Sequence, residues 1–206
     1  MSLAARSVTE LKGAGPRMAE KLERLGIRTQ EDLLFHLPLR YEDRTRITPI
    51  GSLRPEQSAV IEGRILGADV VFGRRRSLLC RVGDGTGVIS LRFFYFTAAQ
   101  KASLEPGRQV RAFGEARPGA TGLEFYHPEY ESAAATLPPL QESLTPVYPS
   151  TEGVSQPVLR KLVAQALIAM EKDPPQDLVP PSVSGEPDLP SLREALTTLH
   201  TPAPDE

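Results

Sequence analysis

The 206-residue sequence has few of the side chains on which metal sites and disulfide scaffolds depend. It contains one cysteine, Cys80, which has no partner for an internal disulfide. Its three histidines, His36, His127 and His200, are too scattered along the chain to show a metal-ligand spacing. We therefore expect no disulfide framework, no zinc module and no cysteine nucleophile.

Long hydrophobic runs are also missing. The longest uninterrupted apolar run is the five residues from Ala166 to Met170, far below the ~20 that a membrane-spanning helix needs. The first ten residues lack the apolar core of about 7 to 15 residues that a secretory signal contains. Because 40% of the residues are hydrophobic, the chain can still bury a core. We expect a folded cytoplasmic protein with no membrane partner.

Signatures of catalysis and nucleotide binding do not occur in the sequence. There is no Gly-x-x-x-x-Gly-Lys-Ser/Thr phosphate loop, no Gly-x-Ser-x-Gly turn, no His-Glu-x-x-His pair and no nucleophile paired with a base. Asp84, in the run Val82 to Gly87, is better explained by turn chemistry than as a general base. We expect no enzymatic activity, no catalytic residue, no metal and no cofactor in this chain.

The net charge of −2 hides an asymmetry along the sequence. Residues 1–115 carry 19 Lys and Arg against 13 Asp and Glu, whereas residues 116–206 carry 5 against 13. This division indicates that the first half meets a polyanion while the second faces solvent or protein. The alternative is a drift of surface charge without function.

Composition separates three segments, which we take as the expected domains: residues 1–50, 51–132 and 133–206. The first is predicted to be helical, the second to be rich in strands, and the third to be a Pro-rich and helical linker.

Two short helices are predicted in the first segment. Pro16 suits the first turn of one helix and Gly26 suits the left-handed residue after its end. Thr29, with Asp32 three residues later, is typical of the start of a second helix, which Pro38 closes.

The middle segment shows the alternation of a small barrel. Its predicted strands are Ser58 to Phe72, Ser77 to Gly83, Gly87 to Phe96, Gln109 to Arg117 and Thr121 to Tyr130. Residues Ala98 to Glu105 favour a helix between the third and fourth strands. The order strand, strand, strand, helix, strand, strand is that of an OB fold, although other small barrels also have five strands.

The last segment combines helices with a proline-rich stretch. An amphipathic helix is predicted from Gln156 to Leu167, and Ser191 is predicted to begin a short helix that ends near His200. Between them, Pro174 to Pro190 holds six prolines in seventeen residues, as a linker or a surface strap would.

Glycines in the first segment suggest a contact with phosphate. The run LKGAGPRMAEKL has the pattern of a helix-hairpin-helix, in which Gly13 and Gly15 permit close approach of a phosphate to the backbone. Lys12 and Arg17 flank this turn. The alternative is a tight turn in a purely structural helical cap.

Two predicted strands of the barrel alternate apolar and polar faces. The side chains expected inside are Leu78, Cys80, Val82, Ile89, Leu91, Phe93 and Tyr95. Those expected outside are Arg81, Val88, Ser90, Arg92, Phe94 and Phe96. A cation beside an exposed ring suits single-stranded nucleic acid, because the cation pairs with phosphate and the ring stacks on a base. The alternative is a ring that helical segments cover.

Arginines in two predicted loops support this interpretation. Arg74, Arg75 and Arg76 lie between the first two strands, and Arg117 precedes the turn between the last two. In OB folds these two loops border the oligonucleotide groove. We expect phosphate contacts, with a solvated turn as the alternative.

Five blocks of sequence resemble one known family. They are LKGAGPRMAEKLERLGIRTQEDLLFHLPLRYEDRT, VGDGTGVISLRFFYF, YHPEYE, LTPVYPSTEGVSQPVLRKL and LREALTTLHTPAPDE, and they occur in order over nearly the whole chain. Together they resemble the N-terminal region of the bacterial ATP-dependent DNA helicases of the RecG family.

The resemblance implies a wedge domain that binds branched DNA at replication forks and Holliday junctions, in DNA repair and recombination. It aligns Phe94 with an aromatic residue that stacks at the branch point. Relatives carry a second aromatic residue four positions later, where this chain has Ala98, so Phe96 or Tyr95 would have to replace it. The family's motor domains, with ATP and Mg²⁺, are expected beyond this chain, as its intramolecular partner.

The sequence therefore predicts an α+β protein with an N-terminal helical hairpin, a five-stranded OB-fold barrel and a C-terminal helical strap. We expect a non-catalytic, nucleoid-associated module for branched DNA. Two alternatives remain, a docking module with weak DNA contact and an OB domain for single-stranded nucleic acid, including RNA. The predicted DNA-binding residues are Lys12, Gly13, Gly15, Arg17, Arg74, Arg75, Arg76, Arg81, Arg92, Phe94, Phe96 and Arg117.

Overall fold

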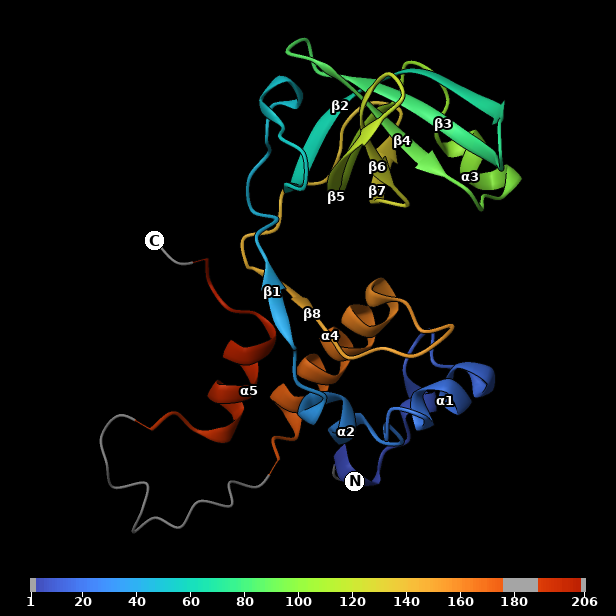
Figure 1. Cartoon of the computed structure of the whole chain (residues 1–206). Coiled ribbons are helices and arrows are strands. Elements are labelled where there is room, and N and C mark those ends of the chain that lie inside the picture. Colours follow the sequence, from blue (N-terminus) through green and yellow to red (C-terminus); the bar gives the residue numbers. More distant parts are fainter. Residues whose placement is uncertain (1–2, 176–188, 205–206) are drawn as a thin grey trace. The chain divides into compact units, whose positions relative to one another are not determined.

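A computed structural model of the chain describes residues 3–175 and 189–204 (Figure 1). The chain divides into two compact units, one formed by Asp43–Gln141 and the other by Met1–Glu42 together with Glu142–Glu206. We name them the barrel unit and the helical unit and describe each by itself. Most of the Pro-rich stretch predicted between residues 174 and 190 lies outside the described residues.

A closed β-sheet forms the barrel unit. Its strands are β2 (Ser58–Phe72), β3 (Arg76–Gly83), β4 (Val88–Phe93), β5 (Gln109–Gly119), β6 (Gly122–Tyr126) and β7 (Glu129–Ala133). They follow the order β2-β3-β4-β6-β5-β7, and β2 also pairs with β5, so that the sheet closes on itself. Strands β4 and β6 run parallel, and the other pairs are antiparallel. With the helix α3 (Ala98–Ser103) between β4 and β5, the element order is the one expected of an OB barrel.

The barrel core uses the faces that alternation predicts. Six of the residues expected inside are at most 2% exposed, namely Leu78, Cys80, Val82, Ile89, Leu91 and Phe93. Burial raises the pKa of the Cys80 thiol to about 12, which keeps it protonated and unreactive at neutral pH. The inward faces predicted for β3 and β4 are therefore confirmed as far as Phe93.

Two strands end earlier than the sequence predicted. Strand β4 stops at Phe93, so the alternation does not continue to Phe96. The predicted strand Thr121 to Tyr130 is two strands, β6 and β7, because His127 between them has a left-handed backbone with φ 46°. The sheet consequently has six strands where five were expected.

The turn between β3 and β4 docks on the 3-10 helix η3 (Ile50–Ser52) through Asp84. The Asp84 carboxylate accepts hydrogen bonds from the backbone amides of Ile50, Thr86 and Gly87 at 2.8–3.1 Å. Although burial opposes ionisation, these bonds lower the pKa of Asp84 to about 2. The interpretation of Asp84 as a turn residue is confirmed.

Helices and a two-stranded sheet form the helical unit. Its elements are η1 (Leu3–Ala5), η2 (Val8–Glu10), α1 (Pro16–Glu23), α2 (Gln30–Phe35), β1 (Arg40–Glu42), β8 (Thr145–Val147), α4 (Gln156–Lys172) and α5 (Leu192–His200). Capping boxes begin α2 at Thr29 and α5 at Ser191, as predicted. The first helix of the predicted hairpin is only the single turn η2. No helix within residues 3–175 or 189–204 is both long and apolar enough to cross a membrane.

The core of this unit joins the two ends of the chain. Helix α4 buries Leu159, Leu162 and Val163 in the same cluster as Leu22 of α1 and Leu34 of α2. Helices of six and eight residues are marginal alone, so they depend on the apolar face of α4 for burial. The division into units therefore differs from the expected segments 1–50, 51–132 and 133–206, because the first and third share a core.

Helix α5 is anchored to this core by a buried histidine. His200 is 2% exposed, and its Nδ1 accepts a hydrogen bond from the Tyr148 hydroxyl at 2.9 Å. Its Nε2 donates to the carbonyl oxygen of Leu34 at 2.8 Å. Burial lowers the pKa of His200 and raises the pKa of Tyr148, so both groups are neutral at pH 7.

Candidate nucleic-acid interface

Four aromatic side chains gather where β4 and β6 end. These parallel strands pair Arg92 with Tyr126, so the residues that follow them meet at one edge of the sheet. The ring of Phe94 lies 5.6 Å from that of Tyr126 and 5.7 Å from that of His127, between centroids. The ring of Tyr95 stacks on His127 at 5.8 Å. We call Phe94, Tyr95, Tyr126 and His127 the aromatic cluster.

The cluster corrects the face assignment beyond Phe93. Phe94 was expected on the outer face of a strand, but it lies in the loop between β4 and α3, half-buried against Tyr126 and His127. Tyr95 was expected inside the barrel and is 76% exposed. The chain leaves the sheet after Phe93, so the two-residue period no longer decides which way a side chain points.

Phe96 was expected outside, and the structure places it against the barrel core. It is half-buried, and the Arg76 guanidinium lies 4.9 Å from the centre of its ring. This distance permits a cation–π interaction. Between the two candidates to replace a second stacking ring, Tyr95 is therefore the exposed one.

Arg92 was predicted to face a phosphate, but it is held within the barrel unit. Its Nε and Nη2 donate to the two carboxylate oxygens of Glu124 at 2.6 and 2.8 Å, and its Nη1 donates to the Ser77 hydroxyl at 3.0 Å. Glu124 is 1% exposed. The Glu124 hydrogen bonds outweigh desolvation and raise the pKa of Arg92. These contacts give Arg92 a structural role, while a DNA contact by Arg92 stays a prediction.

Gly119 makes room for that buried carboxylate. A Cβ atom at this position would lie within 3 Å of three Glu124 side-chain atoms. The turn between β5 and β6 thus needs a residue without a side chain so that Glu124 can reach Arg92.

Exposed arginines flank the aromatic cluster. Arg74 and Arg75 lie in the turn between β2 and β3, and Arg76 begins β3. Because β3 pairs Leu78 with Phe93, this turn lies at the end of the barrel where β4 finishes. The three arginines therefore share that end with the aromatic cluster, as a phosphate-binding loop beside a stacking site would.

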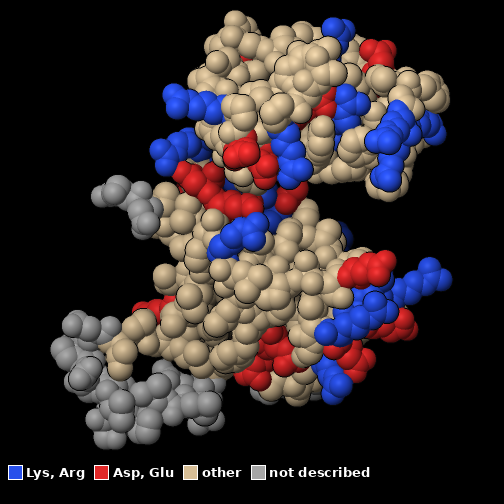
Figure 2. All heavy atoms as spheres, viewed as in Figure 1, with Lys and Arg blue, Asp and Glu red and all other residues tan. Residues whose placement is uncertain are grey.

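Arg81 lies on the outside of the sheet, as predicted, whereas Arg117 was expected in the loop between the last two strands and lies within β5, opposite Glu124 of β6. The Arg117 guanidinium is 5.8 Å from the centre of the Tyr126 ring and also pairs with Glu115 at 3.2 Å. Arg81 is exposed and lies opposite Gly67 of β2. On the face drawn in Figure 2, Lys and Arg side chains form separate groups over the barrel unit, with acidic side chains between some of them.

The predicted phosphate turn lies in the helical unit. Gly13 has a left-handed backbone with φ 99°, and Gly15 caps the start of α1. The Lys12 amide donates to the Gln165 Oε1 at 2.8 Å, and the Gln165 side chain returns a bond to the Lys12 carbonyl. The Ala14 amide donates to the Leu11 carbonyl at 3.1 Å, so two amides of the turn are already occupied, whereas Lys12 and Arg17 are exposed. Contact of this turn with phosphate stays a prediction.

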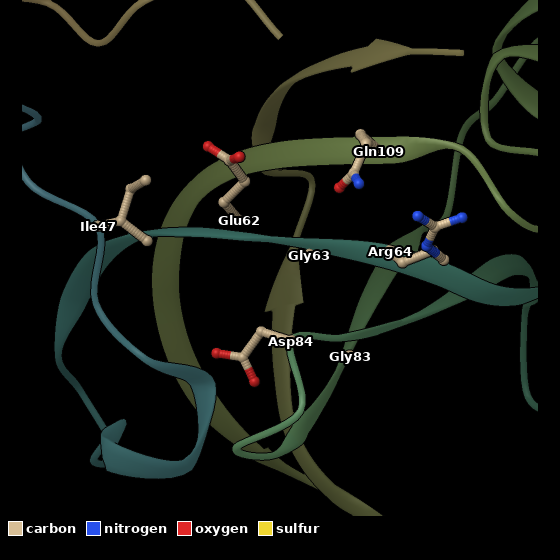
Figure 3. A pocket seen from close by; sticks show the side chains of 7 residues that line it. All are labelled: Ile47, Glu62, Gly63, Arg64, Gly83, Asp84 and Gln109. Atoms are coloured by element: carbon tan, nitrogen blue, oxygen red, sulfur yellow. The ribbon is translucent and has the colours of Figure 1, made fainter. Parts of the chain in front are cut away.

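An open cavity of about 430 Å³ lies elsewhere in the barrel unit (Figure 3). Its lining residues are Ile47, Glu62, Gly63, Arg64, Gly83, Asp84 and Gln109. Asp84 is committed to the turn described above, and Glu62 pairs with Arg111 at 2.8 Å. Within the part of the chain that the structure describes, no group of three or more His, Cys, Asp or Glu side chains could hold a metal ion.

Sequence reasoning missed Tyr126 and His127. Alternation from the buried Phe125 would have placed Tyr126 outside, and Pro128 would have ended the strand there. The parallel pairing of β4 with β6, which brings both residues to Phe94, has no local signal in the sequence.

Comparison with known proteins gives one consistent result. The family model of the RecG wedge domain matches residues 8–170. The ATP-dependent DNA helicases RecG of Escherichia coli (strain K12) and Pasteurella multocida are both 48% identical to the chain, over 96% of its length. The RecG of Staphylococcus aureus (strain NCTC 8325) is 31% identical over 78% of the chain. The chain spans less than a third of each of these proteins, 28%, 28% and 24%.

A solved structure shares the fold. The protein described as RecG bound to a three-way DNA junction aligns with 96% of this chain at a TM-score of 0.75 and 24% identity, and the alignment covers 27% of that protein.

Proposed function

The chain belongs to the RecG wedge-domain family, and on that premise we propose that it is the branched-DNA-binding module of a longer helicase. The relatives are named ATP-dependent DNA helicases, and the structural neighbour is bound to a three-way junction. We propose that this chain binds replication forks and Holliday junctions during repair and recombination in the cytoplasm. ATP and Mg²⁺ would bind to the motor part of such a helicase, which would be its intramolecular partner.

The aromatic cluster is the observation that carries this proposal. Tyr95 is 76% exposed and Tyr126 is 38% exposed, and both lie beside Phe94 and His127 at one end of the barrel, so that several rings are grouped at the surface. A base left unpaired at a branch point would cover such rings, and each base stacked on an aromatic ring contributes ~1–3 kcal/mol. We propose Phe94 as the main stacking residue and Tyr95 as the second.

Exposed cations of the barrel unit would bind the sugar-phosphate backbone. Arg74, Arg75, Arg76, Arg81 and Arg117 are exposed on an OB barrel, in its loops and on its outer face. Arg92 and Phe96 would hold this surface in place through their contacts within the barrel. Lys12, Gly13, Gly15 and Arg17 would form a second phosphate contact, in the helical unit. Phosphate contacts set affinity without reading sequence, which suits a module that recognises the shape of DNA.

Fluorescence anisotropy tests the proposal. The four labelled nucleic acids are a fork, a duplex, a DNA single strand and an RNA. We expect the 206-residue chain to bind a fork more tightly than a duplex of equal length, and to hydrolyse no ATP with or without DNA. Equal affinity for fork and duplex would contradict the branch-point function. Preference for a single strand or for RNA would instead support the alternative of an OB domain for single-stranded nucleic acid.

A second candidate function is docking onto the motor domains with weak DNA contact. One observation favours it, since Phe35, Leu37 and Leu39 of the helical unit are 52%, 43% and 70% exposed. Neighbouring exposed apolar side chains are typical of protein contacts. Micromolar or weaker binding to every DNA, without a preference for forks, would support this function instead.

A further inference from the structure

The corner between β6 and β7 has an unusual backbone. His127 adopts φ 46°, a region that residues with a side chain rarely occupy. Within residues 3–175 and 189–204, the only other residue of this kind besides glycine is Glu56. Such conformations persist where the surroundings hold them, and they concentrate at binding sites.

Two hydrogen bonds tie His127 to the chain that leaves β4. The His127 amide donates to the Arg92 carbonyl oxygen at 2.9 Å, and the Phe94 amide donates to the His127 Nε2 at 3.1 Å. The side chain thus accepts the first amide of the loop that carries the stacking rings. Because Nε2 is the acceptor, it carries no proton in this arrangement.

The imidazole ring also contacts three consecutive aromatic side chains. Its centroid lies 6.0 Å from that of Phe93, 5.7 Å from that of Phe94 and 5.8 Å from that of Tyr95. Phe93 is core, whereas Phe94 is half-buried and Tyr95 is exposed. His127 therefore connects the rigid end of the barrel to the two rings that follow it.

We infer that His127 is a positioning residue for DNA binding, which holds Phe94 and Tyr95 in the orientation that stacks on unpaired bases. The inference rests on the proposed function. His127 acts through the loop backbone and the neighbouring rings, and it need not touch DNA. The strand pairings that close the barrel do not involve the His127 side chain. The pairings of β6 with β4 and β5 end by Tyr126, and the pairing of β7 with β5 begins at Glu129.

Two variants test the role of the His127 side chain separately from the role of its left-handed backbone. His127→Asn removes the imidazole while keeping a residue that tolerates a left-handed backbone. His127→Phe keeps a ring but cannot accept the Phe94 amide. We expect both variants to bind forks about tenfold more weakly, the scale of a single stacking interaction, while affinity for duplex DNA stays within about twofold of the wild-type value.

A mutant cycle that combines His127→Asn with Phe94→Ala/Tyr95→Ala distinguishes positioning from general stabilisation. Because His127 acts through both Phe94 and Tyr95, the triple variant His127→Asn/Phe94→Ala/Tyr95→Ala binds forks as weakly as Phe94→Ala/Tyr95→Ala. A fluorescent 2-aminopurine at the branch point supplies a second readout, because stacking on a protein ring changes its emission. We expect the wild-type change in emission to disappear in His127→Asn.

The outcomes separate this inference from the proposed function. A wild-type chain that binds forks no better than duplex contradicts the proposed function itself and the positioning role with it. Wild-type fork preference with an unaffected His127→Asn variant overturns the positioning role alone. Losses of affinity that multiply in the triple variant also overturn the positioning role, because His127 would then act independently of the two rings. A His127→Asn protein that melts many degrees lower and loses duplex binding equally overturns it as well, because His127 would then be only structural.

Discussion

The two units of this chain are built in opposite ways. The barrel unit is one continuous segment, Asp43–Gln141, whereas the helical unit combines both ends of the chain. The barrel segment contains 13 Lys and Arg against 10 Asp and Glu, and the helical segments contain 11 against 16. The difference indicates that the barrel unit, with its excess of cations and its exposed rings, is the main nucleic-acid surface, and that any phosphate contact of the acidic helical unit is confined to the turn of Lys12 and Arg17.

Buried polar groups also differ between the units. The barrel unit holds an ion pair, in which Glu124 is 1% exposed and Arg92 reaches it with two nitrogens. The helical unit uses neutral groups, His200 and Tyr148, for the same purpose of fixing one element to another. The two units should therefore respond differently to removal of a partner and to pH.

The largest expected effect is on the ion pair of the barrel. Arg92→Ala leaves Glu124 buried without its partner, so the free energy of unfolding should fall by about 3–5 kcal/mol. In the helical unit, the exposed pair of Arg28 and Glu23 gives the control, and Arg28→Ala should cost only about 0–1 kcal/mol. Urea unfolding followed by circular dichroism measures both variants, and equal small losses of stability would show that the Arg92 pair is not structural.

The next effect concerns the three arginines of the β2–β3 turn. Replacement of Arg74, Arg75 and Arg76 by Ala should weaken binding to fork and duplex alike, because phosphate contacts do not depend on branching. The slope of log affinity against log salt should fall by ~0.9 for each duplex phosphate that the variant no longer neutralises. Titrations at several salt concentrations measure that slope, and an unchanged slope would make the loop a solvated turn. Lys12→Ala/Arg17→Ala provides the same test for the helical unit.

The smallest expected effect is a difference in pH dependence. Because the pKa of His200 is lowered in the folded state, its contribution is complete above the unfolded value of 6.5 and falls as the pH drops below it. The pKa of Asp84 is lowered to about 2, so its contribution stays until the pH falls below the unfolded value of 3.8. Between pH 7 and pH 5, the helical unit should lose stability through His200 while Asp84 stabilises the barrel unchanged.

Hydrogen exchange resolved by peptide measures this difference, after correction for the intrinsic effect of pH on exchange. Peptides from α5 should lose protection between pH 7 and pH 5, and peptides from β3 should not. His200→Gln serves as the control, since it removes the titrating group. Protection that falls equally in both units, or a pH response that persists in His200→Gln, would refute the assignment to His200.

Much of the fold could be predicted because its signals are local. The alternation of Leu78, Cys80 and Val82 gave the inner face of β3, and the capping pairs at Thr29 and Ser191 gave the starts of two helices. Asp84 was identified as a turn residue from its neighbours in sequence. Each of these features depends on residues within a few positions of one another.

The missed features depend on residues far apart in sequence. Helix α4 shares its core with α2, which lies more than a hundred positions earlier, so composition placed a boundary between segments that fold together. Arg92 and Glu124 meet because β4 and β6 run parallel, which local periodicity does not show. The sequence placed Phe94 on the face of a strand, whereas it lies in the loop after β4, because alternation does not show where a strand loses its pairing partners.

Phe94 gives the most direct test of the central claim, that the aromatic end of the barrel binds an unpaired base at a DNA branch point. The measurement is the ratio of fork affinity to duplex affinity for wild type and Phe94→Ala, by anisotropy at one salt concentration. Removal of one stacking interaction worth ~1–3 kcal/mol should lower fork affinity about 10- to 100-fold and leave duplex affinity unchanged. The thermal unfolding midpoint should hardly move, because Ile89, Leu91 and Phe93 stay in the core. An equal reduction on fork and duplex, or a midpoint many degrees lower, would contradict the account.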